Sequence, residues 1–534
     1  MPTKVDKLAT PLKKLASLLF WLTLVQGIGC SKQLNSEELE YQPTFCSSPV
    51  PIDVSRIDSA EFAAVVDEVR KEFSDKSGIS VVLFNKEHIL AGYQSGPALD
   101  DLEVDKESAF YIASSTKSLV ATTVLKLYEK GVVDLDTPIG QYLADLHFDS
   151  WLLSEDKITL RHLLTHDTGI SSKALEIRTS ITGEYDRSTL MRLYGEASGS
   201  FLTPQYSNLN YILTGLILEE VTGRTWQQLL ATELFEPLGM ERSFTYWPDA
   251  LEQNIAVPHT MDANRNLYAV PKELTALRTN TLFPSGGVIA SATDLARYVQ
   301  LFLNCGEVNG KPFLSPETIE LAVSPLAENK GGGLHEYFGF GLGWEIAKHD
   351  DLILTLHNGS NKVGARAYMG FAPDLGIGLV ILLNENIVTP YVEGAIAEFA
   401  WDRLRDAQAA EKNLQANLDA WIAKADARFL GRMDGRQYPV FDYPSQSFPD
   451  VPLRVFEGTY TSDEYGTVKV SVQGDQLKVE YGNMVSQRVK RITADQFVGD
   501  FLIEAQQIEF DVSNGKATEV KFIAMGIAFE RSRR

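Results

Sequence analysis

The sequence predicts an α+β fold, in which an antiparallel sheet flanked by helices is combined with a mainly helical subdomain and followed by a small C-terminal antiparallel β domain. Three observations predict this class. Strand-like runs occur near both ends of residues 56–405, helical apolar spacing dominates the sequence between those ends, and short alternating runs fill the last part of the chain. Segregated strands and helices are typical of α+β proteins and not of alternating βαβ units.

Length and composition limit the possible classes of protein. At about 100–200 residues per domain, 534 residues predict more than one folding unit. The hydrophobic content of 44% is that of a globular chain. The net charge of −22 repels phosphate backbones, so nucleic acid is not expected as a partner.

The N-terminal residues have the order of an export signal. Lysines precede an uncharged apolar stretch that begins at Leu15 and ends at Cys30. This ending resembles a bacterial lipoprotein signal, in which the cysteine becomes the acylated first residue. We therefore expect residues 1–29 to be the signal, Cys30 to be lipidated, and the protein to be anchored to a membrane in the bacterial periplasm or cell envelope. Ordinary cleavage and an uncleaved anchor are the alternatives.

A polar tether, residues 30–55, is expected before the first domain, residues 56–405. Apolar residues at helical spacing predict helices near its two ends, over 59–73 and 392–404. The predicted strands are 78–84, 88–96, 352–359, 365–373 and 376–386. The sheet of this domain is therefore expected to be assembled from both ends of its sequence, around a largely helical insertion.

Two segments follow this domain. Residues 406–452 combine a charged, alanine-rich helical stretch with a proline-rich stretch, and they are predicted to be a linker. Residues 453–534 contain short alternating runs separated by turn residues, which predict a small antiparallel β domain.

Ser114 and Lys117 form the strongest candidate constellation. Apolar residues at helical spacing follow them until Gly131, so Ser114 is expected at or near the N-terminus of a helix. Residues three apart lie on one helical face, which lets the Lys117 amine reach the Ser114 hydroxyl. The helix dipole and burial disfavour the ammonium form, so Lys117 can act as the base that activates a serine nucleophile.

The Ser-x-x-Lys pattern alone is not specific, because it also occurs at Ser154 and Ser513, in a charged loop and a hairpin turn. Only Ser114 leads into a long, mostly apolar helix. Two further elements accompany it. Tyr206-Ser207-Asn208 lies in a loop before a helical run, and His357-Asn358-Gly359-Ser360 ends a predicted strand.

In this order, the three elements resemble the serine β-lactamase and penicillin-binding protein superfamily, in particular its class C β-lactamase, DD-carboxypeptidase and esterase branch. They are separated by 206 − 114 = 92 and 357 − 206 = 151 residues. A run of ordered matches is far more specific than one motif. Supporting stretches are Ile158–Gly169, Glu236–Met240, Pro284–Gly287, Thr293-Asp294, Gly341–Trp344 and Asn384. The resemblance covers roughly residues 56–405.

The resemblance implies a serine hydrolase that forms an acyl-enzyme with an ester, amide or D-amino-acid peptide substrate. Ser114 would be the nucleophile, Lys117 its activating partner and Tyr206 the proton carrier. Asn208 would hold either the substrate amide or the lysine. A non-catalytic protein of the same fold, which binds cell-wall peptide or a β-lactam, is the alternative.

The third element is expected to bind the substrate through His357, Gly359 and Ser360, with the backbone N–H groups of Ser114 and Ser360 as the oxyanion hole. His357 departs from the class C β-lactamase pattern, which has lysine at this position. Histidine is mostly neutral at pH 7 and offers less charge to a substrate carboxylate. This departure disfavours β-lactamase and strict carboxypeptidase activity. The other interpretation of His357 is a strand residue satisfied by hydrogen bonds.

No metal or organic cofactor is implied. His162 and His166 have the i, i+4 spacing of a zinc helix but lack its glutamate, and we interpret them as structural. Cys46 and Cys305 can pair in an oxidising compartment or stay unpaired, and both alternatives remain open. The C-terminal domain resembles β modules appended to some relatives. The resemblance implies that it borders the active-site cleft and restricts substrates. The alternative is that it only stabilises or tethers the protein.

Overall fold

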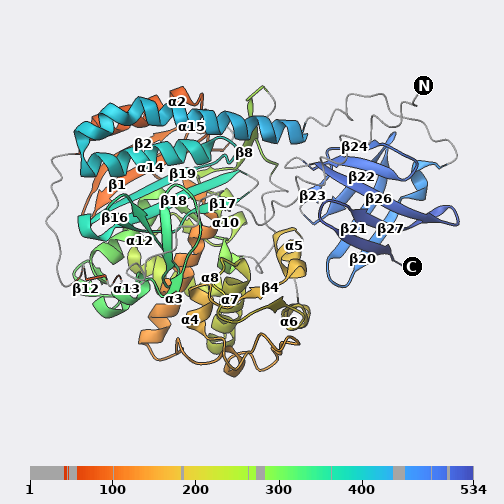
Figure 1. Cartoon of the computed structure of the whole chain (residues 1–534), viewed down its shortest axis with the longest axis horizontal. Helices are drawn as coiled ribbons and strands as arrows, with labels where there is room; N and C mark the ends of the chain where they lie inside the picture. Colours follow the sequence, from red (N-terminus) through yellow and green to blue (C-terminus); the bar gives the residue numbers. More distant parts are fainter. Residues whose placement is uncertain are drawn as a thin grey trace. The chain divides into compact units, whose positions relative to one another are not determined.

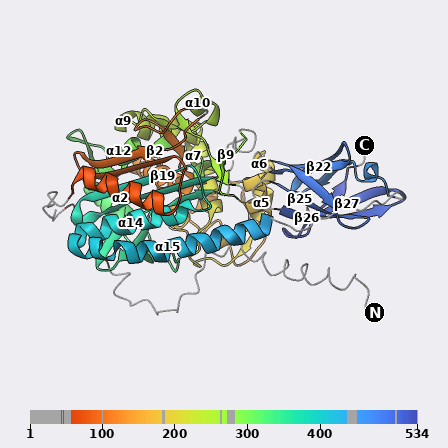
Figure 2. The same ribbon diagram turned by 90° about the horizontal axis from the view of Figure 1, so that it is seen from above.

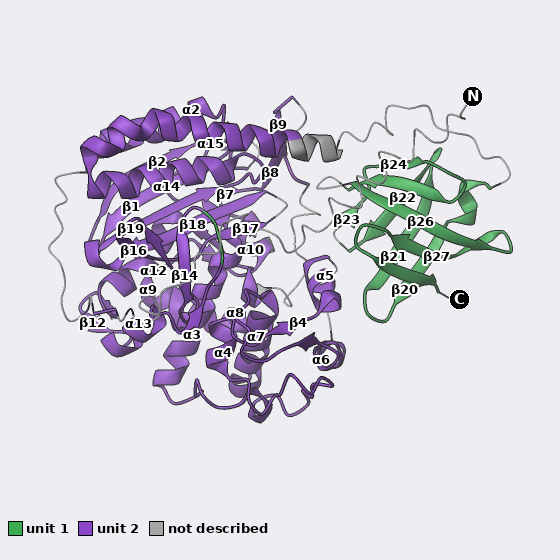
Figure 3. Ribbon diagram, viewed as in Figure 1, with its two compact units in different colours: residues 1–32, 331–333, 432–534 green, residues 33–330, 334–431 purple. Residues whose placement is uncertain are grey.

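The computed structural model describes residues 41, 43–44, 46, 57–99, 101–181, 186–261, 264–271, 283–361, 364–436, 451–482, 484–501 and 505–532. The chain divides into two compact units (Figure 3). One unit comprises residues 33–330 and 334–431, and the other comprises residues 1–32, 331–333 and 432–534. The predicted export signal and Cys30 lie outside the described residues.

The larger unit is built on an antiparallel sheet (Figure 1). In the described residues its strand order is β13-β14-β15-β16-β18-β19-β1-β2, and β17 pairs with β18. The strands are β1 Ile79–Asn85, β2 Ile89–Ser95, β13 Ala327–Glu328, β14 Glu336–Phe340, β15 Glu345–His349, β16 Leu352–Leu356, β17 Gly359–Asn361, β18 Ala365–Ala372 and β19 Ile377–Leu383. Strand β1 pairs with β19 from Ile79↔Leu383 to Asn85↔Ile377, so strands from near both ends of the first domain meet as predicted.

Helices cover both faces of this sheet. On one face, α2 (Ser59–Glu72), α14 (Thr389–Arg405) and α15 (Ala407–Arg436) lie side by side (Figures 1 and 2). On the other face, α12 (Ala292–Leu303) packs against β1 and β19. Helix α2 begins where the Asp58 side chain accepts a hydrogen bond from a backbone N–H, and it buries an apolar stripe against the sheet.

Helix α15 falls inside the segment predicted to be a linker, residues 406–452. It packs within the larger unit, where the Trp421 indole donates to Glu398 of α14 at 2.6 Å. Arg403 of α14 forms an ion pair with Glu411 at 2.6 Å. The domain boundaries stay predictions, but the helical part of this segment contributes to the first unit.

A mainly helical subdomain is inserted between β2 and β13, as predicted. Its described helices include α3 Thr116–Glu129, α4 Leu160–Leu164, α5 Lys173–Ile181, α6 Arg187–Gly195, α7 Asn208–Thr222, α8 Trp226–Leu230, α9 Glu236–Leu238, α10 Trp247–Leu251 and α13 Pro316–Ala322. Short strands accompany them: β3 Ala109–Tyr111, β4 Ile170–Ser171, β5 Ser198–Gly199, β6 Ser243–Phe244, β7 Ile255–Ala256, β8 His259–Met261, β9 Leu267–Ala269, β10 Ile289–Ser291, β11 Glu307–Val308 and β12 Lys311–Pro312. The buried residues of α3 join those of the sheet and of α7 in one apolar core.

Cys46 and Cys305 form a disulfide bond, which settles the alternative left open by the sequence. The bond joins residues 259 positions apart and ties the segment around Cys46 to the end of α12. The Cys46 N–H also donates to the Glu320 carboxylate at 3.2 Å. Disulfides of this kind persist in oxidising compartments, which is consistent with an exported protein.

The smaller unit contains an antiparallel sheet with the order β23-β22-β21-β20-β28-β27-β26-β25-β24 in its described residues. The strands are β20 Gly458–Ser462, β21 Gly466–Gln473, β22 Gln476–Tyr481, β23 Met484–Val485, β24 Arg488–Arg491, β25 Gln496–Asp500, β26 Ala505–Ser513, β27 Lys516–Phe522 and β28 Ile527–Arg531. Alternate residues of these strands are buried and form an aromatic core that includes Phe456 and Phe510, whose ring centroids are 4.8 Å apart. The predicted fold class is confirmed. None of the helices in the described part of the chain is long and apolar enough to cross a membrane.

Candidate active site

Ser114 lies in a single turn of 3₁₀ helix, Ala113–Ser115, directly before α3. The preceding residue, Ala113, has a φ of 45°, which is uncommon for a residue with a side chain. The turn is held by a hydrogen bond from the Ser115 N–H to the Ile112 carbonyl at 3.2 Å. Strained backbone of this kind concentrates at functional sites. Because α3 is almost entirely buried, its N-terminal end presents the partly exposed Ser114 from a rigid support.

Lys117 is fully buried and its amine lies between three acceptors. The Nζ atom donates to Ser114 Oγ at 3.2 Å, to Asn208 Oδ1 at 2.7 Å and to the Ser285 carbonyl at 2.6 Å. Burial lowers the pKa of Lys117 well below its usual value, and the charge of Glu345 opposes this only in part. An amine in this position can exist as the neutral base that takes a proton from a serine.

Asn208 is brought to Lys117 by the start of α7. The Ser207 side chain caps this helix by accepting from the Leu209 N–H at 3.2 Å, and Asn208 is the first helical residue. Of the two partners expected for Asn208, its carbonyl oxygen contacts the lysine. Ser285 was not singled out from the sequence, although it lies in the supporting stretch Pro284–Gly287.

Tyr206 lies beside both residues of the pair. Lys117 Nζ is 4.8 Å from the centre of the Tyr206 ring, and 39% of the Tyr206 surface is exposed. Burial of the hydroxyl end raises the pKa of Tyr206, and a hydrogen bond with Ser114 opposes this increase. The phenol therefore keeps its proton at neutral pH while it contacts the serine.

His166 also belongs to the site, although we interpreted this histidine as structural from the sequence. Its ring packs on Tyr206 with centroids 4.5 Å apart, and its Nδ1 accepts a hydrogen bond from the Ser207 N–H at 3.1 Å. His162 has a separate task, since its Nδ1 accepts from the Thr159 N–H at the start of α4. Within the described residues, no group of three His, Cys, Asp or Glu side chains is arranged to hold a metal ion.

His357 lies in the same site, with only 1% of its surface exposed. Its Nδ1 donates to the Gly343 carbonyl at 2.8 Å, and its backbone carbonyl accepts from the Ser115 hydroxyl at 2.7 Å. Burial and the neighbouring Lys117 lower the pKa of His357 to about 3. His357 is therefore neutral at physiological pH. Its ring nitrogen Nε2 is buried without a hydrogen-bond partner among the described residues.

The remaining two predicted residues, Gly359 and Ser360, belong to β17. In this strand Gly359 pairs with Ala367. A Cβ atom on Gly359 would lie 1.9 Å from the carbonyl oxygen of Ile112, so only glycine allows β17 to approach the turn that carries the serine. The Ser360 hydroxyl accepts from the Asn386 amide at 2.9 Å. The predicted catalytic and substrate-binding residues, all of which are described, therefore gather around Ser114, whereas Cys30 lies outside the described residues.

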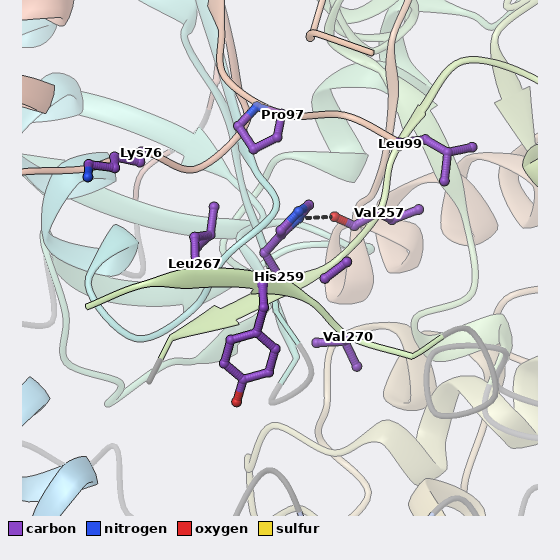
Figure 4. A pocket seen from close by; sticks show the side chains of 9 residues that line it. Lys76, Pro97, Leu99, Val257, His259, Leu267 and Val270 are labelled. Carbon is purple, nitrogen blue, oxygen red and sulfur yellow. Dashed lines mark hydrogen bonds between the residues drawn. The ribbon is translucent and has the colours of Figure 1, made fainter. Parts of the chain in front are cut away.

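A separate cavity of about 470 Å³ lies in the larger unit (Figure 4). It is lined by Lys76, Pro97, Leu99, Val257, His259, Leu267, Tyr268, Ala269 and Val270. The His259 Nδ1 is 2.7 Å from the Val257 carbonyl, which accounts for one of its ring nitrogens. None of the residues that line this cavity is among the site residues predicted from the sequence.

Comparison with known proteins agrees with this geometry. Residues 66–398 match the family model described as Beta-lactamase. The chain is 26% identical over 295 residues to "Penicillin-binding protein 4" of Amycolatopsis lactamdurans, which covers 54% of this chain and 75% of that protein. It is 25% identical over 378 residues to "Esterase EstB" of Burkholderia gladioli, which covers 63% of this chain and 93% of that protein.

A solved structure shares the fold of most of the chain. It is the octameric penicillin-binding protein homologue from Pyrococcus abyssi, with a TM-score of 0.55 and 21% sequence identity, over 87% of this chain and 98% of that one. The family model covers more than half of the chain and includes Ser114, Lys117, Tyr206 and His357. The chain therefore belongs to the beta-lactamase family of serine hydrolases, which act through an acyl-enzyme.

Proposed function

We propose that Ser114, Lys117 and Tyr206 carry out a two-step acyl transfer. The observation that carries this proposal is the buried Lys117 amine, 3.2 Å from Ser114 Oγ. Lys117 takes the hydroxyl proton while Ser114 Oγ bonds to the substrate carbonyl carbon. The leaving group departs with a proton delivered through Tyr206, and water then attacks the acyl-enzyme and releases the acid.

The other predicted residues have supporting tasks in this proposal. Asn208 holds the Lys117 amine, since its carbonyl oxygen accepts from Nζ at 2.7 Å. The backbone N–H groups of Ser114 and Ser360 form the oxyanion hole, and Gly359 allows the strand to come close enough. The contact between Ser114 and Lys117 favours an enzyme over a non-catalytic binding protein.

We infer that the substrate is an ester or amide of a small molecule or peptide. Because the pKa of about 3 keeps His357 neutral, the site has no cation at this position to bind a substrate carboxylate. This favours esters and amides that lack the terminal carboxylate of a cell-wall peptide. The name of the Burkholderia relative, an esterase, is consistent with this class.

A hydrolysis panel tests this substrate class. It compares a short-chain p-nitrophenyl ester, a D-Ala-D-Ala peptide and a cephalosporin with the same enzyme sample. We expect kcat/KM for the ester to exceed that for the other two by about tenfold or more, because the activated leaving group and the missing cation for a substrate carboxylate both act in this direction. Preferred cleavage of the D-Ala-D-Ala peptide or the cephalosporin would contradict the argument from His357.

We also propose that the protein is exported and lipidated at Cys30. The Cys46–Cys305 disulfide fixes Cys46, 16 positions after Cys30, to the catalytic unit, so an acylated Cys30 would hold this unit close to a membrane. Cys30→Ala is expected to move the protein from the membrane fraction to the soluble fraction after cell fractionation. Retention of the variant in the membrane fraction would favour an uncleaved anchor.

A further inference from the structure

His166 contacts the segment around Tyr206 in three ways. The Gln205 N–H donates to the His166 carbonyl at 2.9 Å. The Ser207 N–H donates to His166 Nδ1 at 3.1 Å. The imidazole also packs on the phenol ring of Tyr206, with ring centroids 4.5 Å apart and an angle of 34° between the ring planes. The two residues that flank Tyr206 and the Tyr206 ring itself are therefore all held by one residue.

The backbone of His166 has a conformation that histidine rarely adopts. Helix α4 ends at Leu164, Thr165 is its C-cap, and His166 follows with a φ of 59°. Glycine is the usual residue at this position, because a side chain is strained in the left-handed region. A glycine would end the helix with less strain, but it would offer no ring to Tyr206. The end of α4 alone therefore does not account for a histidine here.

The His166 ring is buried, with 2% of the residue surface exposed. Burial lowers the pKa of His166 well below its usual value, and the neighbouring Lys117 and His357 lower it further. The ring is therefore neutral, and its proton is on Nε2 because Nδ1 accepts a hydrogen bond. Nε2 has no hydrogen-bond partner in the described part of the chain. A residue that only filled this space would be better apolar, since a buried polar group without a partner costs stability.

The surroundings of the His166 ring fix its position. The rings of Tyr211 and Phe340 lie 5.4 and 5.1 Å from it, measured between centroids. The Tyr211 hydroxyl donates to the Leu164 carbonyl at 3.0 Å, so the end of α4 is attached to α7. The imidazole is thus a rigid support on which Tyr206 rests.

We propose that His166 is a positioning residue for Tyr206, and that it holds the phenol where its hydroxyl can pass a proton to the leaving group. The inference rests on the proposed role of Tyr206 in proton delivery. His166 acts through Tyr206 and takes no proton itself. A misplacement of about 1 Å can lower a rate about 10²-fold, so a less constrained Tyr206 should slow the reactions that need its proton. A leaving group that departs as a stable anion should be affected far less.

Two variants remove the ring of His166 without straining the backbone. In His166→Asn the amide oxygen can still accept from the Ser207 N–H, and asparagine tolerates the left-handed conformation. His166→Gly fits that conformation best and also lacks the ring. The matched control is His162→Asn in the same helix. The His162 Nδ1 accepts from the Thr159 N–H at 3.1 Å, and its ring packs on Phe201 with centroids 5.0 Å apart.

Ethyl butyrate and p-nitrophenyl butyrate form the same acyl-enzyme but differ in their leaving groups. Ethanol must depart with a proton, whereas p-nitrophenolate departs as a stable anion. We expect His166→Asn and His166→Gly to lower kcat/KM for the ethyl ester by about tenfold or more, and for the p-nitrophenyl ester by less than about threefold. His162→Asn should keep the wild-type ratio of the two values.

Fluorophosphonate labelling of Ser114 releases fluoride, which needs no proton from Tyr206. Labelling of His166→Asn at about the wild-type rate is therefore expected, and it shows that the variant is folded. An equal loss of kcat/KM for both esters in this folded variant would overturn the proposal, because a merely structural role affects every substrate alike.

Tyr206→Phe separates this inference from the proposed function. It keeps the ring that packs on His166 and removes the hydroxyl, so the ethyl ester should again be affected more. Adding His166→Asn to Tyr206→Phe should then lower kcat/KM no further. A further loss as large as in the single variant would overturn the inference and leave the role of Tyr206 intact. An unchanged ratio of the two esters in Tyr206→Phe would instead contradict the proposed role of Tyr206, and this inference with it.

Discussion

Ser114→Ala is expected to abolish covalent labelling by a fluorophosphonate probe and to lower ester hydrolysis by at least about 10⁴-fold, as is typical when a nucleophile is removed. The physical reason is the absence of any atom that can form the acyl-enzyme. Labelling is measured by gel fluorescence and by the mass of the intact protein, and hydrolysis by release of p-nitrophenol.

Ser513→Ala is a matched control, because Ser513 also precedes a lysine by three residues. Ser513 ends β26 at an exposed hairpin turn. We expect this variant to be labelled at the wild-type rate. Equal labelling of wild type and Ser114→Ala would instead place the nucleophile elsewhere. The fold should survive in both variants. Ser114→Ala removes only the side-chain oxygen that accepts a hydrogen bond from Lys117 at 3.2 Å. A melting temperature close to that of the wild type checks this.

The parts of the site that were predicted from sequence depend on local geometry or on ordered motifs. Ser114 and Lys117 are three residues apart, and helical periodicity is enough to place them on one face. Tyr206, Asn208 and His357 were found through the order of the three elements. The alternation and turn residues of the strands likewise predicted the sheet, because a period of two is visible in one strand.

The unpredicted parts depend on long-range packing. The Ser285 carbonyl accepts a hydrogen bond from Lys117, which is 168 positions away in the sequence. Because this oxygen belongs to the backbone, any residue type could supply it, and the sequence does not reveal the role. His166 joins the site by accepting a hydrogen bond from the Ser207 N–H, 41 positions away in the sequence. The helix α15 was assigned to a linker because its apolar residues are sparse, although Leu418 is fully buried.

The disulfide shows the same limit. Cys46 and Cys305 are 259 positions apart, and nothing in the sequence brings the two cysteines together. The short distance in space between Cys46 and Cys305 depends on the folded positions of α12 and of Cys46. Their Cα atoms are 5.5 Å apart, within the range that is usual for a disulfide.

Lys117→Met is expected to lower the rate of acylation by about 10²–10⁴-fold, the usual contribution of a general base. Lys117→Arg should lose as much, although it keeps a positive charge, because the guanidinium does not release its proton in the accessible pH range. The measurement is the rate of fluorophosphonate labelling as a function of pH. Lys130→Met, at the end of the same helix and distant from Ser114 in sequence, is the control that should label at the wild-type rate.

The sign of the pH dependence follows from the burial of Lys117. Protonated Lys117 cannot accept the serine proton, so labelling should rise with pH through the pKa of this amine and then level off. Since burial lowers that pKa well below its ordinary value, the rise should lie on the acidic side of the usual range for lysine. Lys117→Met and Lys117→Arg should both lack this rise in labelling rate with pH.

No second transition is expected near neutral pH from the aromatic groups of the site. His357, with a pKa of about 3, is already neutral, and the raised pKa of Tyr206 keeps its proton in place. A wild-type labelling rate in Lys117→Met would mean that another group, with Tyr206 the nearest candidate, takes the proton. This result would separate positioning from proton transfer. Asn208 and the Ser285 carbonyl hold the Lys117 amine beside the serine. The amine can accept the serine proton only when burial has made it neutral.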